Sequence, residues 1–322
     1  MKRGSRHMKE TTMKMKTNVT GSALMFVLIA AMTANTVATG RNSYRSEIAK
    51  FRAEREAELK AENGWLSVAG LFWLKEGENR FGADPSNEIV LPKESAPPRA
   101  GLFEFHQGTT TLRVAPGTAV TLNGKPVATA EVRTDEKLVP DVVRVGSLSL
   151  TVIKRGERYG IRVKDLNSKQ RREFKGLRWF PVKEAFRITA KFVAYAQPKD
   201  IDIANVLGDV SKNPSPGYAV FNFRGKEYRL DPILEGKDKL FFIFADLTNN
   251  KTTYGAGRFL YTSLPQDGKV TLDFNRAENP PCAYTRFATC PLPPKQNRLK
   301  IAIEAGERNY TSPLHQESPD RE

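Results

Sequence analysis

Apolar and polar positions alternate along most of this chain, which is the pattern of antiparallel strands with one buried face. Residues 64–165 hold several short alternating runs separated by turn residues, among them GLFEFHQG and TTLRVAPG. Asn123-Gly124 lies between two of these runs and is a strong hairpin signal. The close spacing of short strands predicts a small β-sandwich.

A second strand-rich segment covers residues 186–309. Gly, Asn, Asp and Pro punctuate it, and Arg224-Gly225 marks a predicted hairpin. Its predicted strands are FRITAKFVAYA, IDIANVLGD, GYAVFNFRGKEYRL, KLFFIFADLTN, TYGAGRFLYTSLP, KVTLDFNR and RLKIAIEAG. Antiparallel strands in this number predict a β-barrel-like domain or a second sandwich.

Three segments flank or join these domains. Residues 39–63 are rich in helix formers, contain few apolar positions and end at Asn63-Gly64, so they predict one surface helix. Residues 166–185 predict a polar, basic connector, and residues 310–322 a disordered tail. The predicted fold class is therefore all-β, mainly antiparallel, with one N-terminal helix.

The start of the chain changes the expected location. Basic residues precede the apolar run ALMFVLIAAM at 23–32, and small residues follow it. This order predicts a signal peptide over residues 1–38, with Thr36-Val37-Ala38 at the cleavage point, and an extracytoplasmic (periplasmic or secreted) protein. An uncleaved N-terminal anchor is the alternative, although the run is short for a membrane span.

Charge narrows the expected partners. The full chain carries a formal net charge of +15, and it stays basic without the leader. Small anionic ligands, glycans and anionic envelope surfaces are therefore candidate partners, the last through peripheral association. Nucleic acid is not expected, because no recognition module is present. The sequence sets no oligomeric state.

The only two cysteines, Cys282 and Cys290, lie in residues 279–294, NPPCAYTRFATCPLPP, here called the Pro/Cys loop. Outside the cytoplasm they are expected to form a disulfide, with free thiols and a metal site as alternatives. A metal would need further His or Cys ligands, and the chain's histidines are His7, His106 and His315. We therefore predict no metal and no cofactor.

Two resemblances to known families follow from longer motifs. The order of NRFG, the Asn123-Gly124 turn and VRVGSLSLTV resembles a forkhead-associated domain. That family binds phosphothreonine through an Arg after its first glycine turn and a Ser-x-x-His motif. Here Ala83 and Asp84 follow Gly82, and residues 95–106 lack Ser-x-x-His. The resemblance therefore implies an FHA-like β-sandwich that serves as a scaffold.

The second resemblance covers residues 45–308. LFFIFADLTNNKTTYGAGRFLY and LDFNRAENPPCAYTRFATCPLPPKQNRLKIAIEAGE look like the uncharacterised bacterial family known as domain of unknown function 1684. GWLSVAGLFWLKEGENRFG and FKGLRWFPV are similar to that family as well. This resemblance implies kinship and no particular activity.

Polar side chains near strand ends and the Pro/Cys loop supply the candidate site. The candidate catalytic carboxylates are Asp273, Asp246 and Glu307, and the candidate ligand-binding residues are Tyr254, Arg258, Asn275, Arg276 and Tyr284. Each also has a structural interpretation. A carboxylate at 246 suits a cap for the Thr248-Asn249 turn, an Asp–Arg pair suits a hairpin, and an amide at 275 suits an anchor for the Pro/Cys loop.

The sequence argues against a serine or cysteine hydrolase with a catalytic histidine and against a dinucleotide-binding enzyme. No histidine accompanies a candidate nucleophile in the second β domain, and GAGR at 255–258 has no βαβ context. We therefore expect an exported protein that binds a small anionic or glycan-like ligand in its C-terminal β domain. A carboxylate-dependent hydrolase and a structural envelope protein are the alternatives.

Overall fold

The computed structural model describes residues 1, 42–137 and 139–311. The predicted signal peptide beyond Met1, and the tail beyond residue 311, lie outside the described residues. The chain forms two compact units, Met1–Ala49 and Lys50–Glu322. Residues 42–49 of the first unit and residues 50–60 of the second unit are helical.

The chain leaves the helix in a tight turn at Gly64, close to the last helical residues. A Cβ at Gly64 would lie 2.3 Å from the carbonyl oxygens of Glu58 and Leu59, so only glycine fits this close approach. The 3-10 turn η1 (Trp65–Ser67) follows directly and leads into the first strand. The apolar residues 65–73 thus form a turn and a strand, and Leu66 is fully buried.

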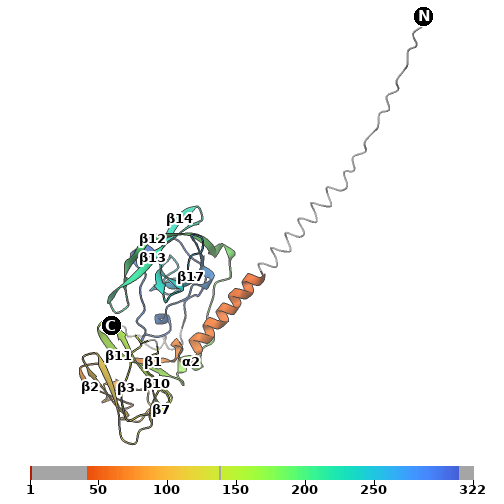
Figure 1. Ribbon diagram of the computed structural model, residues 1–322. Helices are drawn as coiled ribbons and strands as arrows, with labels where there is room; N and C mark the ends of the chain where they lie inside the picture. The colour runs from red at the N-terminus through yellow and green to blue at the C-terminus, as the bar shows by residue number, and fades with distance from the viewer. Residues whose placement is uncertain (2–41, 138, 312–322) are drawn as a thin grey trace. The chain divides into compact units, whose positions relative to one another are not determined.

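Two sheets form the first β domain, as the alternation predicts (Figure 1). The six-stranded sheet has the order β1-β11-β10-β9-β6-β7, and the five-stranded sheet has the order β3-β2-β4-β5-β8. The strands are β1 (Val68–Trp73), β2 (Gly77–Gly82), β3 (Ile89–Val90), β4 (Gly101–His106), β5 (Thr109–Val114), β6 (Val120–Leu122), β7 (Lys125–Pro126), β8 (Thr129–Glu131), β9 (Val143–Val145), β10 (Leu148–Arg155) and β11 (Arg158–Asp165).

Both sheets contribute to one core, which makes the domain a sandwich. Phe81 and Phe103 from the smaller sheet meet Leu150 and Ile161 from the larger one. The predicted hairpin at Asn123-Gly124 is confirmed, since both residues have positive φ between β6 and β7.

A short connector follows the sandwich. It contains the one-turn helix α2 (Lys169–Arg172) and the 3-10 turn η2 (Glu184–Phe186). Among the residues that the structure describes, no helix has the length and apolar content needed to cross a bilayer.

The C-terminal β domain also contains two sheets (Figure 1). Their orders are β14-β13-β12-β18 and β15-β16-β17, and the sheets contact each other through β17 with β18 and β13 with β15. The strands are β12 (Arg187–Ala204), β13 (Val210–Phe223), β14 (Lys226–Leu230), β15 (Ile233–Glu235), β16 (Lys239–Phe244), β17 (Arg258–Ser263) and β18 (Lys269–Asp273). The 3-10 turns η3 (Phe274–Arg276), η4 (Pro281–Ala283) and η5 (Lys295–Asn297) complete it.

Strand β16 has apolar side chains on both faces, and each face packs against other apolar side chains. Leu240, Phe242 and Phe244 pack into the main core of the domain. Phe241 and Ile243 point the other way, into a smaller cluster that includes Cys290. A continuous apolar run is the expected pattern for a strand buried on both sides.

The fold class predicted from the sequence is confirmed: the described chain is mainly antiparallel β structure with one N-terminal helix. One predicted strand is wrong. RLKIAIEAG, at 298–306, is irregular, with an isolated bridge at Arg298. Its backbone pairs with buried charges instead: Ile303 N donates to Asp246, and the carbonyls of Ile303 and Ala305 accept from Arg258.

Candidate functional site

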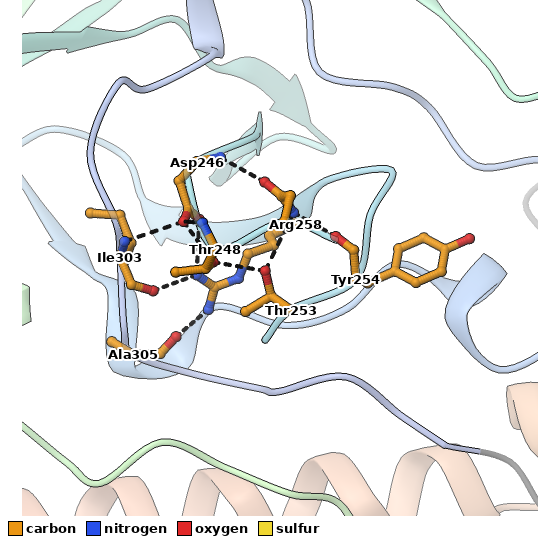
Figure 2. Close-up of polar contacts among 8 residues, drawn as sticks. Asp246, Thr248, Thr253, Tyr254, Arg258, Ile303 and Ala305 are labelled. Carbon is orange, nitrogen blue, oxygen red and sulfur yellow. Dashed lines mark hydrogen bonds and ion pairs between the residues drawn. The ribbon is translucent and has the colours of Figure 1, made fainter. Parts of the chain in front are cut away.

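The first buried polar cluster surrounds Arg258, the first residue of β17 (Figure 2). Its side chain is fully buried. Nη1 donates to Asp246 Oδ2 at 3.2 Å and to the Ile303 carbonyl at 2.9 Å, and Nη2 donates to the Ala305 carbonyl. Burial lowers the pKa of Arg258, and the Asp246 charge opposes that shift.

Asp246 organises the turn after β16 through its other oxygen. Oδ1 accepts from Thr248 N at 2.8 Å and Thr248 Oγ1 at 2.6 Å, and from Ile303 N at 3.2 Å. The Thr248 and Thr253 hydroxyls are 2.8 Å apart and extend the network (Figure 2). Asp246 therefore caps the turn and pairs with Arg258, as its structural interpretation predicted. Both charged side chains are fully buried.

Asp273, Asn275 and Arg276 meet at the end of β18. Asp273 Oδ1 accepts from Asn275 N at 3.1 Å, and Arg276 Nε lies 3.6 Å from Asp273 Oδ2. The Asn275 amide bonds both backbone groups of Lys183, at 3.0 Å and 2.9 Å. Asn275 thus anchors the connector, where the sequence had suggested the Pro/Cys loop.

The second buried cluster joins Glu307 and Tyr284, two further predicted site residues, to the N-terminal helix. Glu307 is fully buried. Its carboxylate accepts from Arg55 Nε at 3.1 Å, from Asn279 N at 2.9 Å and from the Tyr284 hydroxyl. Arg55 also donates to the Asn279 carbonyl at 3.1 Å. We call Arg55, Glu278, Tyr284 and Glu307 the Arg55 cluster.

Glu278 is the less buried of the two carboxylates that Arg55 binds. Its side chain is 12% exposed, and Oε2 lies 3.2 Å from Arg55 Nε. Burial raises the pKa of Glu278 to about 7; Arg55 opposes the shift, whereas Glu307 and Glu58 add to it. One guanidinium thus serves two carboxylates, and the more accessible one changes protonation near neutral pH.

Aromatic side chains lie on the same face as Glu278. Glu278 and Phe259 exchange two backbone hydrogen bonds of 2.9 Å, and directly opposed residues of an antiparallel pair share a face. Tyr261, two residues beyond Phe259, stacks on Phe241 with centroids 4.6 Å apart and planes 7° apart. We call Phe241, Tyr261, Glu278 and Glu235 the aromatic–carboxyl face.

Tyr261 is surrounded and yet accessible. It is 38% exposed, but burial is the main cause that raises its pKa, with further contributions from Glu278 and Glu235. Its hydroxyl has no hydrogen-bond partner among the described residues.

The Pro/Cys loop lies next to this face. Cys282 and Cys290 are both thiols, and Cys282 N donates to Cys290 Sγ at 3.1 Å. Tyr254, another predicted site residue, donates from its hydroxyl to the Cys282 carbonyl at 3.2 Å. The disulfide between the two cysteines stays a prediction. Within residues 42–137 and 139–311, no group of three His, Cys, Asp or Glu is arranged to hold a metal ion.

The predicted site residues therefore lie in separate groups and do not form one site. Three residues that were not predicted also belong to the clusters and the face described above. Arg55, Glu278 and Tyr261 were not singled out by sequence reasoning. Arg55 meets its partners across more than two hundred residues, so no local pattern reveals it. Glu278 directly precedes NPPC, and this position beside a proline-walled loop was the one available signal.

Comparison with known proteins confirms the resemblance of the C-terminal part. Residues 172–308 match the family described as "Protein of unknown function (DUF1684)". No curated protein matches the sequence. An uncharacterised protein of Haloarcula marismortui, solved by NMR, is 29% identical, with a TM-score of 0.36 over 44% of this chain and 80% of that chain.

Forkhead-associated domains are also among the similar solved structures. One, from a study of phosphothreonine-dependent FHA domain interactions, is 20% identical, with a TM-score of 0.21 over 29% of this chain and 92% of that chain. Another is the FhaA domain in complex with an intracellular domain, 19% identical, with a TM-score of 0.21 over 29% of this chain and 97% of that chain.

Removing the charge of Asp246 tests the first cluster. We expect Asp246→Asn to lower the free energy of unfolding by about 3–5 kcal/mol, because it leaves the Arg258 guanidinium buried without its counter-ion. Urea denaturation measures this change, and Arg286→Lys, at an exposed arginine of the Pro/Cys loop, is the control. A loss below about 1 kcal/mol, the range of an exposed ion pair, would contradict the structural role.

Replacing Glu278 tests the second cluster through pH. The pKa of Glu278 is raised from 4.5 to about 7 on folding, so its stabilising contribution is complete below 4.5 and is lost as pH rises through about 7. Between those values we expect the wild type to lose about 2–3 kcal/mol of unfolding free energy relative to Glu278→Gln. Denaturation at a series of pH values measures the difference. Glu235→Gln, at an exposed carboxylate, should run parallel to the wild type; parallel curves for Glu278→Gln would refute the shift.

Proposed function

We propose that the C-terminal β domain binds a small glycan-like molecule on the aromatic–carboxyl face. The observation that carries this proposal is the combination of a carboxyl that keeps a small exposed fraction and has a pKa of about 7 with a partly exposed, stacked tyrosine. Ligand sites are mostly apolar and aromatic, with a few placed polar groups that fix orientation. The ring plane of Tyr261 can stack against the C–H groups of a sugar ring, and the Glu278 carboxyl can form hydrogen bonds with the sugar hydroxyls.

Glu278 supplies the polar part of this recognition. While protonated it both donates and accepts a hydrogen bond, and when ionised it only accepts. Arg55 Nε lies 3.2 Å from Oε2 of this carboxyl, and no hydrogen bond within the described residues uses Oε1. Binding is therefore expected to depend on pH around neutrality.

The proposed location is outside the cytoplasm. Its support is the leader-like segment at residues 1–38, with its basic start and the apolar run at 23–32. In that compartment Cys282 and Cys290 are expected to oxidise and stiffen the Pro/Cys loop beside the face.

A carboxylate-dependent hydrolase is a second candidate, favoured by one specific observation. A general acid or base works best with a pKa near the operating pH, and Glu278 has such a value. Asp246, Asp273 and Glu307 are each buried within hydrogen-bond networks, so Glu278 is the carboxyl placed to meet a substrate.

Calorimetric titration of the mature chain, recovered from the periplasm, tests the proposal. The probes are neutral oligosaccharides and their uronic-acid counterparts, at mildly acidic and mildly alkaline pH. We expect saturable binding that Tyr261→Ala weakens roughly tenfold through loss of stacking, whereas Tyr261→Phe retains most of it. Leu264→Ala, at an exposed residue just beyond β17, should have no effect.

Product analysis in the same samples separates the candidates. Binding without turnover supports a binding protein. Release of shorter sugars by the wild type, and its loss in Glu278→Gln, indicates the hydrolase. If the wild type binds none of the probes, or if the Tyr261→Ala variant binds them as tightly as the wild type, the proposed binding face is wrong. A structural role in the envelope is then the remaining alternative.

A further inference from the structure

A buried arginine lies outside the face already described, on strand β11 of the FHA-like sandwich. Its neighbours along the strand, Ile161 and Val163, point into the sandwich core. Arg162 therefore projects from the opposite face of the sheet. It is nevertheless only 9% exposed, and its guanidinium lies 5.2 Å from the centroid of Trp65.

The Arg162 guanidinium is unpaired in a specific way. Nε and Nη2 are buried and have no hydrogen-bond partner among the described residues. These two N–H groups point in parallel and form the edge of arginine that binds two oxygens of one carboxylate or phosphate. Arg258, by contrast, uses both terminal nitrogens on protein oxygens. Burial of an unpaired charged donor is costly, so a missing partner is expected here.

The charges around Arg162 are predominantly positive. Arg155 and Asp135 both act on it electrostatically, and Asp135 is already bound to Arg155 at 2.8 Å. Burial lowers the pKa of Arg162 to about 10, and the Arg155 charge adds to the shift. Burial likewise lowers the pKa of Lys164 to about 8, with Arg162 adding to it. Arg162 is thus a buried cation without a local counter-ion, and the partly buried Lys164, whose ammonium donates to the Asn63 carbonyl at 2.5 Å, adds positive charge.

Polar groups of the Pro/Cys loop border the same position. Thr289 Oγ1 accepts from Arg155 Nε at 3.2 Å, and the Cys282 and Cys290 sulfurs are close enough to affect Arg162 electrostatically. Trp65, Lys164 and Cys282 are only partly buried, so solvent reaches the surroundings of the guanidinium.

We propose that Arg162, with Lys164 and the Pro/Cys loop, forms an oxyanion-binding site for a carboxylate or phosphate group of a small molecule. The two unpaired N–H groups bind two of its oxygens, and the excess positive charge supplies the attraction. The site uses none of the residues of the aromatic–carboxyl face, so it stands independently of the proposed glycan binding. A thiolate of Cys282 or Cys290 is the competing partner for Arg162.

Thermal unfolding and calorimetric titration of the mature full chain test the site. Inorganic phosphate and acetate are the probes, with sodium chloride used to hold the ionic strength constant. We expect saturable binding and a rise in melting temperature with at least one probe, as a ligand of the native state requires. Arg162→Met should abolish the response, and Arg162→Lys should weaken the affinity about tenfold, because lysine keeps the charge without the paired N–H groups.

Two further results decide the assignment. Arg144→Met, at an exposed arginine of the same sheet, should respond like the wild type. Arg162→Met should also melt no lower than the wild type without anion, since it removes an unpaired charge. A wild type that responds to chloride as strongly as to phosphate and acetate, or an Arg162→Lys variant with unchanged affinity, would overturn the proposal. An unresponsive wild type whose thiols, measured in the reduced protein, become less acidic in Arg162→Met would assign the arginine to the thiolate instead.

Discussion

The ion pair between Arg55 and Glu307 holds together the parts of the chain on which the candidate site depends. Arg55 comes from the N-terminal helix and Glu307 from the last irregular segment, and Tyr284 of the Pro/Cys loop donates to the same carboxylate. A buried carboxylate is stable only when such donors surround it. The cluster therefore holds the N-terminal helix, the Pro/Cys loop and the last irregular segment together.

The same constraint produces the unusual carboxyl at Glu278. Arg55 is shared between Glu307 and Glu278, and the fully buried Glu307 has the additional donors. Burial is the main cause that raises the pKa of Glu278 to about 7; the shared Arg55 opposes the shift, and the Glu307 charge adds to it. A structural cluster thereby creates a carboxyl whose pKa lies near neutrality, and such groups often belong to functional sites.

Gly306 connects this cluster to the one around Arg258. A Cβ there would lie 2.2 Å from the Ala277 carbonyl oxygen and 2.8 Å from Arg258 Nη2, and its φ of 79° favours glycine. Its neighbours Ala305 and Glu307 belong to the two clusters, one through a carbonyl and the other through a carboxylate. The two buried networks are thus linked through one short segment.

Sequence reasoning recovered what local pattern encodes. Alternation gave the strands, and positive-φ residue pairs gave the hairpins at Asn123-Gly124 and Arg224-Gly225. The Asp246–Arg258 pair was also within reach, because a hairpin of that length brings its two ends together. Residues 298–306 alternate like a strand, but their backbone bonds Asp246 and Arg258, a long-range effect that alternation cannot reveal. Arg55 and Arg162 were missed for the same reason, since each owes its role to residues distant in the sequence.

The most direct test of this account is the protonation of Glu278 itself. A carbon-13 NMR titration of the side-chain carboxyl carbons, assigned by comparison with Glu278→Gln, measures its pKa. The Arg55 cluster predicts a midpoint near 7 in the wild type. A midpoint near the ordinary value of 4.5 would show that the shared arginine and burial do not govern this carboxyl, and would contradict the site built on it.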